Sequence, residues 1–104
     1  MGVEVNLEGN VATISVVGSF DIGCYESFNA SYRPYLSSKD NVFIIDMEHA
    51  TYMDSSALGM LLLLRDRTGG DRDRVLITNV GKSVMEVLQV ANFDQLFNIQ
   101  PKDL

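Results

Sequence analysis

The sequence has little of several residue types and patterns that define particular protein classes. Its 104 residues include one cysteine, Cys24, so an internal disulfide is impossible and a reducing compartment is favoured. The longest apolar run, residues 57–64, contains Gly59 and is too short to cross a bilayer. A basic start followed by a long apolar run, which marks a secretory signal, is missing as well. We therefore expect a cytoplasmic protein with no direct membrane insertion.

Positive charge is also scarce. Eight Lys and Arg residues stand against 14 Asp and Glu residues, which gives a formal net charge of -6, and no local basic patch is visible along the sequence. Such a chain is repelled by nucleic acid and by anionic membrane surfaces. We predict neither as a partner.

Residues for metal, cofactor or catalytic chemistry are few. His49 is the single histidine and stands far from Cys24 in sequence, so a metal site lacks ligands. The tripeptide 81–83 resembles the end of a phosphate-binding loop, but Leu76 stands where that motif needs glycine. A triad of Ser55, His49 and an aspartate is formally conceivable, yet the chain has no Gly-x-Ser-x-Gly elbow. We expect no metal, no cofactor and no enzymatic activity.

The chain does contain enough apolar material for one core. Hydrophobic residues make up 46% and charged residues 21%, as in a globular domain, and no linker or repeat divides residues 1–104. Patterns of period two and period 3.6 predict four to five strands and three to four helices in one domain. The expected strands are residues 2–7, 11–17, 42–47, 75–78 and, as a short fifth, 96–99; the expected helices are residues 25–36, 56–67 and 82–91.

Three local features refine this prediction. Pro34 lies inside the first helical pattern and should end or kink that helix early. The run 42–47 is continuously apolar up to Asp46 rather than alternating, which indicates a buried strand. Residues 48–54 are predicted to form a loop.

The order of the elements favours an α/β fold. It predicts a mixed, mostly parallel sheet that begins with a hairpin. In open sheets of this kind, functional loops follow the carboxyl ends of the parallel strands. Three loops, beginning near Asp21, Asp54 and Asn79, should therefore meet at one edge of the sheet.

The most informative stretch is the start of the second helix, where Asp54, Ser55 and Ser56 precede an almost wholly apolar segment. Any of the three could cap the helix, but one cap is enough and no capping box accompanies them, so at least one hydroxyl should be exposed. A phosphate at this position is tolerated by the helix dipole and adds about -1.5 to -2 charge beside Asp54. The residues permit a charge switch as well as an ordinary cap.

The same helix has more apolar side chains than a single stripe requires. Most of the excess should pack on neighbouring helices. The remainder would form an apolar patch suited to protein binding, with Met60 fit for an adaptable contact. Its candidates are Leu58, Met60, Leu61, Leu62, Leu63 and Leu64.

Together these residues resemble a known family. The run from Asp46 to Leu64 is similar to the STAS domain of bacterial anti-sigma factor antagonists, in which a strand ending in Asp and a short loop lead into Asp-Ser-Ser/Thr-Gly-Leu-Gly. Residues 18–21 resemble the family's Gly-Glu-Leu-Asp, and residues 87–97 resemble its C-terminal segment. Ala57 and Ser19 depart from the family's Gly and Glu.

The resemblance implies a STAS fold and a phosphorylation-controlled partner switch in bacterial signal transduction and transcription regulation. Ser55 would accept the phosphoryl group, with Asp21, Asp54 and Ser56 forming its environment and the kinase contact. The unphosphorylated chain would bind an anti-sigma factor that is also a serine kinase of the histidine-kinase-like ATPase type, and a PP2C-type serine phosphatase would restore that form. The partner-binding surface would comprise Gly18, Phe20, Ala57, Leu58 and Met60.

A second hypothesis belongs to another class. STAS domains also serve as constitutive accessory subunits of transport complexes, such as lipid ABC transporters. The same surface would then bind the transporter's ATPase, and the serine would be structural. Phosphoserine in cells and a kinase in pull-downs would favour the switch, whereas an ATPase subunit would favour the accessory subunit.

Overall fold

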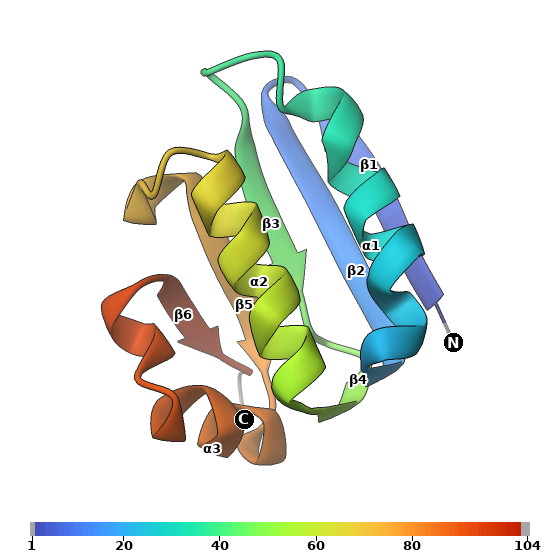
Figure 1. The fold of residues 1–104 in the computed structure, drawn as a ribbon, viewed down its shortest axis with the longest axis vertical. Coiled ribbons are helices and arrows are strands. Elements are labelled where there is room, and N and C mark those ends of the chain that lie inside the picture. Colours follow the sequence, from blue (N-terminus) through green and yellow to red (C-terminus); the bar gives the residue numbers. More distant parts are fainter. Residues whose placement is uncertain (1, 103–104) are drawn as a thin grey trace.

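The computed structural model describes residues 2–102, which form a six-stranded sheet with helices α1 and α2 side by side on the face seen in Figure 1. The strands are β1 (Gly2–Glu8), β2 (Val11–Phe20), β3 (Val42–Asp46), β4 (Ala50–Met53), β5 (Val75–Val80) and β6 (Asn98–Pro101). The α-helices are α1 (Tyr25–Tyr32), α2 (Ser55–Arg67) and α3 (Lys82–Val90). Short 3-10 turns lie at Ile22–Cys24, Arg33–Tyr35, Arg72–Arg74 and Phe93–Gln95.

The sheet has the order β1-β2-β3-β5-β6, and β4 pairs with β2 outside this row. β1 and β2 form an antiparallel hairpin, whereas every other pairing is parallel. The prediction of an α/β fold with a mixed, mostly parallel sheet and an N-terminal hairpin is therefore confirmed. The sheet has six strands rather than four to five, because one strand was missed.

The missed strand is β4, which occupies most of the stretch expected to be a loop. β2 runs on to Phe20, beyond its expected end, so its last backbone groups need hydrogen-bond partners. After β3 ends, the chain turns and follows β2, pairing Gly18 with Ala50 and Phe20 with Met53. The Gly18 amide also donates to the His49 carbonyl oxygen at 2.9 Å. A parallel partner thus converts a polar, loop-like sequence into a strand.

Two other expectations concern α1 and β3. α1 ends at Tyr32 and continues as the turn Arg33–Tyr35, so Pro34 ends the α-helix as predicted.

β3 was expected to be buried throughout, but burial alternates along it: Phe43 and Ile45 are buried, whereas the residues between and beside them are half-buried. Only one face of this strand is therefore fully in the core.

Aromatic side chains join α1 to the sheet. Four aromatic rings form a continuous row in the order Phe20, Phe28, Tyr32 and Phe43. The centroids of successive rings along this row are 5.1, 5.7 and 6.3 Å apart. The buried Tyr32 hydroxyl donates to the Asn29 side-chain oxygen at 3.2 Å and accepts from Arg67 Nη1 at 3.1 Å. Burial raises the pKa of this hydroxyl, against the opposing effect of the Arg67 charge. This cluster fixes α1 against α2 and against the sheet.

We expect Leu61→Ala in α2 to lower the free energy of unfolding by about 2–5 kcal/mol, because Leu61 is wholly buried and its removal leaves a cavity. Leu62→Ala, at the next position, removes a side chain that is 41% exposed and should change stability by less than about 1 kcal/mol. Urea unfolding followed by circular dichroism measures both. Equal effects of the two substitutions would contradict the packing of α2 described here.

Candidate functional site

The start of α2 is organised by a single carboxylate. Asp54 has extended backbone angles, and its Oδ1 accepts hydrogen bonds from the Ser56 amide at 3.0 Å and the Ala57 amide at 3.2 Å. Asp54 is therefore the N-cap, and neither serine is needed for that role. Ser55, the first helical residue, is exposed, and Ser56 is half-buried. Within residues 2–102 neither hydroxyl has a side-chain hydrogen bond, so the Ser55 oxygen is free to react.

The rotation of α2 about its axis decides which side chains accompany Ser55. Ala57, Met60, Leu61 and Leu64 are the buried residues of the helix, and their spacing defines one stripe against the sheet. The opposite face of the helix has the same i, i+3, i+4, i+7 spacing as the buried stripe, and it comprises positions 55, 58, 59 and 62. On this outward face Leu58 is half-buried and Leu62 is exposed, so Ser55 stands at the end of a partly apolar surface.

Strand pairing brings Asp21 to this end of α2. Phe20 and Met53 are paired on neighbouring parallel strands, whose backbones lie about 5 Å apart. Asp21 and Asp54 directly follow these two residues. Asp21 caps the turn Ile22–Cys24, and its Oδ1 accepts from the Gly23 amide at 2.9 Å. Two capping carboxylates therefore leave adjacent strand ends, as the topology predicted for these two loops.

The third loop lies at the same edge but beside a different strand. β3 separates β5 from β2, and the Asn79 side-chain nitrogen donates to Asp46 Oδ1 at 2.9 Å. Asp46 Oδ1 also accepts from the Glu48 amide at 3.0 Å, which fixes the turn between β3 and β4. Asn79 therefore supports the segment leading to β4 and does not face Asp21.

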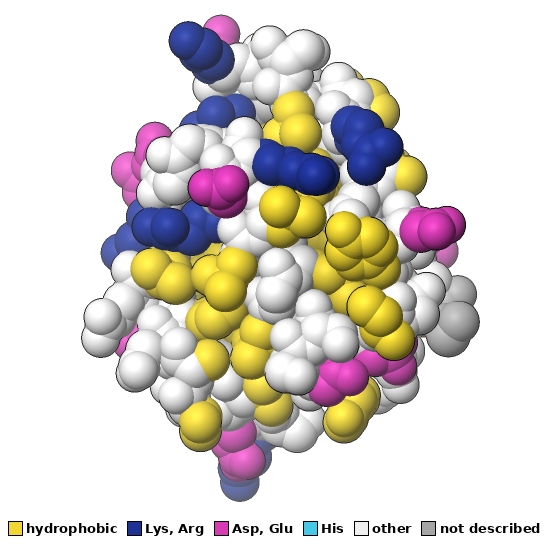
Figure 2. Space-filling view, viewed as in Figure 1, with side chains coloured by type: hydrophobic (Ala, Val, Ile, Leu, Met, Phe, Trp, Pro, Cys, Tyr) yellow, Lys and Arg dark blue, Asp and Glu magenta, His cyan; other side chains and the backbone are white. Residues whose placement is uncertain are grey.

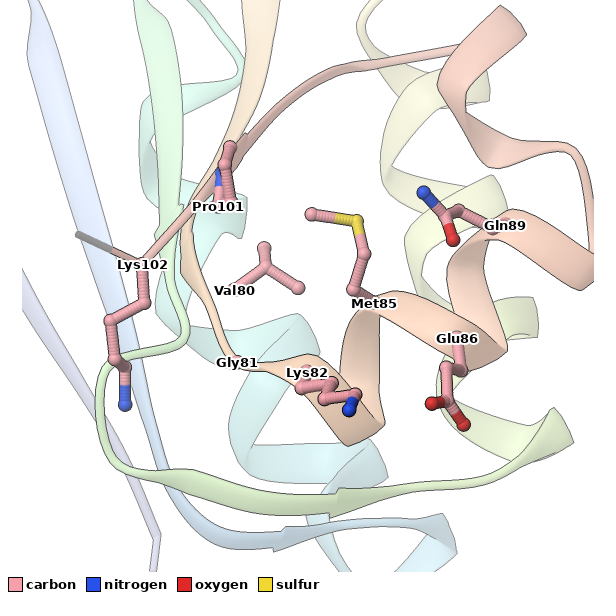
Figure 3. Close-up of a pocket in the computed structure, with 8 residues that line it drawn as sticks. All are labelled: Val80, Gly81, Lys82, Met85, Glu86, Gln89, Pro101 and Lys102. Carbon is pink, nitrogen blue, oxygen red and sulfur yellow. The ribbon is translucent and has the colours of Figure 1, made fainter. Parts of the chain in front are cut away.

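A cavity of about 490 Å³ opens beside this edge, between α3 and β6. Figure 3 shows Val80, Met85 and Pro101 around its apolar part, and the polar side chains around them include Lys82 and Lys102. Lys102 Nζ lies 3.0 Å from Glu48 Oε2 and donates to the Glu48 carbonyl oxygen at 2.8 Å. Lys102 thereby ties the end of β6 to the turn before β4. The sequence did not reveal the pairing of Lys102 with Glu48, which lies 54 residues earlier in the chain.

The surroundings of Ser55 are acidic. No Lys or Arg occurs in residues 2–32 or 42–64, which include α1, β4 and the first ten residues of α2. Asp21, Glu26 and Asp54 lie in these segments. These segments therefore hold no cation that could pair with a phosphate on Ser55, and the lysines at this edge of the molecule are Lys82, at the start of α3, and Lys102, which pairs with Glu48. The charge of the phosphate would face solvent or a bound protein.

Three of the residues expected in the partner-binding surface are in the core instead. Phe20 and Ala57 have no exposed surface and Met60 has 2%, so the expectation that their side chains contact a partner is wrong. Phe20 continues the buried alternation of Ala12, Ile14 and Val16 along β2, and the other two belong to the buried stripe of α2. Gly18 is half-buried and has no side chain, although its backbone holds the turn before β4.

Other apolar side chains at this end of the molecule are exposed, and of these only Leu62 was among the residues expected to face away from the sheet. Ile22 is 67% exposed, Tyr52 is 52% exposed, and Tyr25 and Leu62 are exposed as well. Leu62 could have been singled out from the other candidates, because it lies seven residues on from Ser55 and so shares its face of the helix. Ile22 and Tyr25 could not, because their exposure depends on how the turn after β2 leads into α1. We define Ile22, Tyr25, Tyr52, Leu58 and Leu62 as the apolar rim of the Ser55 site.

Comparison with known proteins identifies the family. A STAS domain family model matches residues 3–102, so the chain belongs to the STAS domain family. A STAS-domain-containing protein of Pseudomonas aeruginosa strain UCBPP-PA14 is 40% identical over 92 residues, covering 88% of this chain and 90% of that protein.

Solved structures share the fold. The unphosphorylated form of the anti-sigma factor antagonist SpoIIAA has a TM-score of 0.73 at 16% identity, covering 99% of this chain and 90% of that one. The phosphorylated form of SpoIIAA from Bacillus has a TM-score of 0.71 at 17% identity, covering 94% and 90%. An anti-sigma factor antagonist of Mycobacterium paratuberculosis has a TM-score of 0.81 at 16% identity, covering 95% and 84%.

Two further findings concern only the residues that the structure describes. No helix among them has both the length and the apolar character needed to cross a membrane. In the same part of the chain, no group of three or more His, Cys, Asp and Glu side chains could hold a metal ion.

We expect Asp54→Ala to lower the free energy of unfolding by about 0.5–2 kcal/mol, because the amides of Ser56 and Ala57 lose their acceptor. Asp54→Asn keeps a capping oxygen and should retain most of the stability. Asp66→Ala, at the exposed other end of α2, is the matched control and should be neutral or slightly stabilising. If the Asp54 and Asp66 variants unfold alike in urea, Asp54 is not the cap that holds this site.

Proposed function

We propose that this protein is a phosphorylation-controlled partner switch of the anti-sigma factor antagonist type, with Ser55 as the phosphoryl acceptor. It acts by binding another protein rather than by catalysis. The unphosphorylated form binds a serine kinase of the histidine-kinase-like ATPase type, which doubles as an anti-sigma or equivalent switch factor. Phosphorylation of Ser55 releases this partner, and a PP2C-type phosphatase restores the binding form.

The observation that carries the proposal is the exposed Ser55 hydroxyl at a helix start already capped by Asp54. Because Asp54 satisfies the Ser56 and Ala57 amides, the serine hydroxyl has no structural duty among the described residues. A kinase can reach it, and its modification leaves the core stripe of α2 unchanged. The apolar rim supplies a surface of the kind that protein partners bury.

The charge distribution explains why modification would change binding. A phosphate on Ser55 adds about -1.5 to -2 charge beside Asp54, and residues 2–32 and 42–64, which form α1, β4 and the start of α2, contain no Lys or Arg. Two negative charges facing a partner's carboxylate at about 5 Å cost roughly 2 kcal/mol even in water, which corresponds to about 30-fold in affinity. Partial exclusion of water at an interface increases this effect.

The relatives support the proposal at the level of the family. SpoIIAA, whose fold this chain shares, has been solved in unphosphorylated and phosphorylated forms. The similarity of the two TM-scores, 0.73 and 0.71, is consistent with a modification that a STAS fold accommodates without a change of architecture.

Incubation with a candidate switch kinase and ATP should place one phosphate on Ser55, as mapped by mass spectrometry. Ser55→Ala should abolish the modification and keep full binding of the kinase, whereas Ser55→Asp should weaken binding, because it adds one negative charge beside Asp54. Isothermal titration calorimetry measures the binding of each form.

Ser56→Ala is the matched control, since Ser56 is the half-buried neighbour with the same side chain. It should leave both phosphorylation and binding close to those of the unchanged protein. Phosphate on Ser56 instead of Ser55, or equal binding by the Ala and Asp variants at position 55, would refute the switch. Stable capture of a transporter ATPase with no phosphoserine in cells would favour the constitutive accessory subunit.

A further inference from the structure

The strand β1 lies at the edge of the sheet and has a neighbour on one side. In the order β1-β2-β3-β5-β6 it pairs with β2 alone, and Figure 1 shows it at the border of the molecule beside α1. All seven of its residues pair with β2 in a continuous register. Among residues 2–102, no other segment makes a backbone hydrogen bond to β1. One long side of this strand is therefore open.

The register of the hairpin decides which backbone groups lie on the open side. Glu8 and Val11 flank a two-residue turn, so they form a hydrogen-bonded pair, and such pairs alternate along an antiparallel ladder. The even-numbered residues of β1 therefore direct their N–H and C=O groups toward β2. The odd-numbered residues Val3, Val5 and Leu7 direct theirs away from it. These backbone groups have no partner among the described residues.

The same three residues carry the apolar side chains of the strand. Their partners on β2 are buried, so the three side chains lie on the face of the sheet that the helices cover. Val3 is half-buried, but Val5 is 40% exposed and Leu7 is 42% exposed. Unpaired backbone groups and incompletely covered apolar side chains thus occur together along one edge.

The usual devices that keep an edge strand from pairing are missing from β1. Proteins commonly place proline, lysine or a bulge in such a strand, and β1 contains none of these. Its two charged residues are Glu4 and Glu8, whose side chains lie on the other face of the sheet. Like charges directly opposite each other destabilise a strand pair, so these carboxylates restrict which strand can be added and in which register.

A second copy of β1 fits this edge in one antiparallel register. Because only odd-numbered residues have free backbone groups, a two-fold axis must pass through a residue. With the axis at Val5, each Val5 faces its own copy, each Val3 faces Leu7, and all free N–H and C=O groups are paired. Glu4 then faces Asn6, whose side-chain amide can donate to the carboxylate. Registers centred one residue to either side place glutamates opposite each other, and larger shifts leave free groups unpaired.

We propose that β1 is an interaction surface for a second copy of this chain, and that two copies form a two-fold dimer by antiparallel pairing of their β1 strands about Val5. The two sheets join into one, and the apolar side chains of the two strands cover each other. The contact is small, so the dimer is weak, with a dissociation constant between about 10 μM and about 1 mM. The pairing uses neither Ser55 nor the apolar rim and does not depend on the proposed switch.

Sedimentation equilibrium of the purified protein over this concentration range tests the dimer. The average mass should rise from that of one chain, 11.5 kDa, toward twice that value. Val5→Lys should weaken association about tenfold or more, because two ammonium groups then face each other and an apolar contact is lost. Val90→Lys makes the same change at a position in α3 that is 85% exposed and should leave association unchanged. Added salt should strengthen association, because each copy carries a net charge of -6.

A charge pair at position 5 tests the register. Val5→Glu alone should also associate poorly, but an equimolar mixture of Val5→Lys and Val5→Glu should associate about tenfold more tightly than either variant alone. This rescue requires that position 5 face its own copy. Urea unfolding of both variants shows whether the exposed substitution has left the fold intact.

Amide hydrogen exchange of the unchanged protein tests the same pairing without a substitution. The amides of Val3, Val5 and Leu7 should exchange more slowly at high than at low protein concentration, because the dimer bonds them. Those of Glu4 and Asn6 should be protected alike at both concentrations, since β2 already bonds them in the single chain.

A mass of one chain at about 1 mM would overturn the proposal and would leave the edge to an extended segment of a different protein. Association without slower exchange of the three odd-numbered amides would overturn it as well. The same holds if Val5→Lys and Val90→Lys associate equally, or if the mixture of position-5 variants associates no more tightly than each alone.

Discussion

The rotation of α2 about its axis is the constraint on which the Ser55 site depends. Burial of Ala57, Met60, Leu61 and Leu64 against the sheet leaves one orientation for the helix, and in that orientation position 55 faces outward. The Asp54 carboxylate fixes where the helix begins by accepting the Ser56 and Ala57 amides. The core stripe and the cap together place a serine hydroxyl in solvent at a fixed position, without using that hydroxyl in the fold.

The position of Asp54 in turn depends on β4. This short strand is held to the end of β2 by backbone pairing, and the turn before it is fixed by Asp46 and by Lys102. Asp21 and Asp54 therefore leave neighbouring strand ends and bring their charges to one surface. Six of the eight Lys and Arg residues lie instead in residues 33–41 and 65–74, toward the other end of α2, and Figure 2 shows these charges gathered in that half of the molecule. Lys82 and Lys102 remain at the edge that carries β4. The STAS fold of this chain thus carries an acidic surface at the start of α2, where a phosphate on Ser55 adds to charge of the same sign.

The sequence alone predicted much of this arrangement, and the gaps have identifiable physical causes. Apolar periodicity located α2 and α3 and the hairpin, because burial on one face leaves a period that can be read directly. It did not find β4, whose existence depends on the free edge of β2 rather than on its own residues. The family resemblance led us to place Phe20, Ala57 and Met60 in the contact surface, although the alternation of β2 and the stripe of α2 put all three in the core. The expectation that the chain has no local basic patch was also wrong, because two segments from different parts of the chain, residues 33–41 and 65–74, bring their Lys and Arg residues together.

The most direct measurement is the affinity of the purified protein for its switch kinase before and after complete phosphorylation of Ser55, determined at one ionic strength with the kinase unable to turn over ATP. Our account predicts that the phosphate raises the dissociation constant by about 30-fold or more while the circular dichroism spectrum stays the same. An unchanged dissociation constant, with phosphate verified on Ser55, would contradict it.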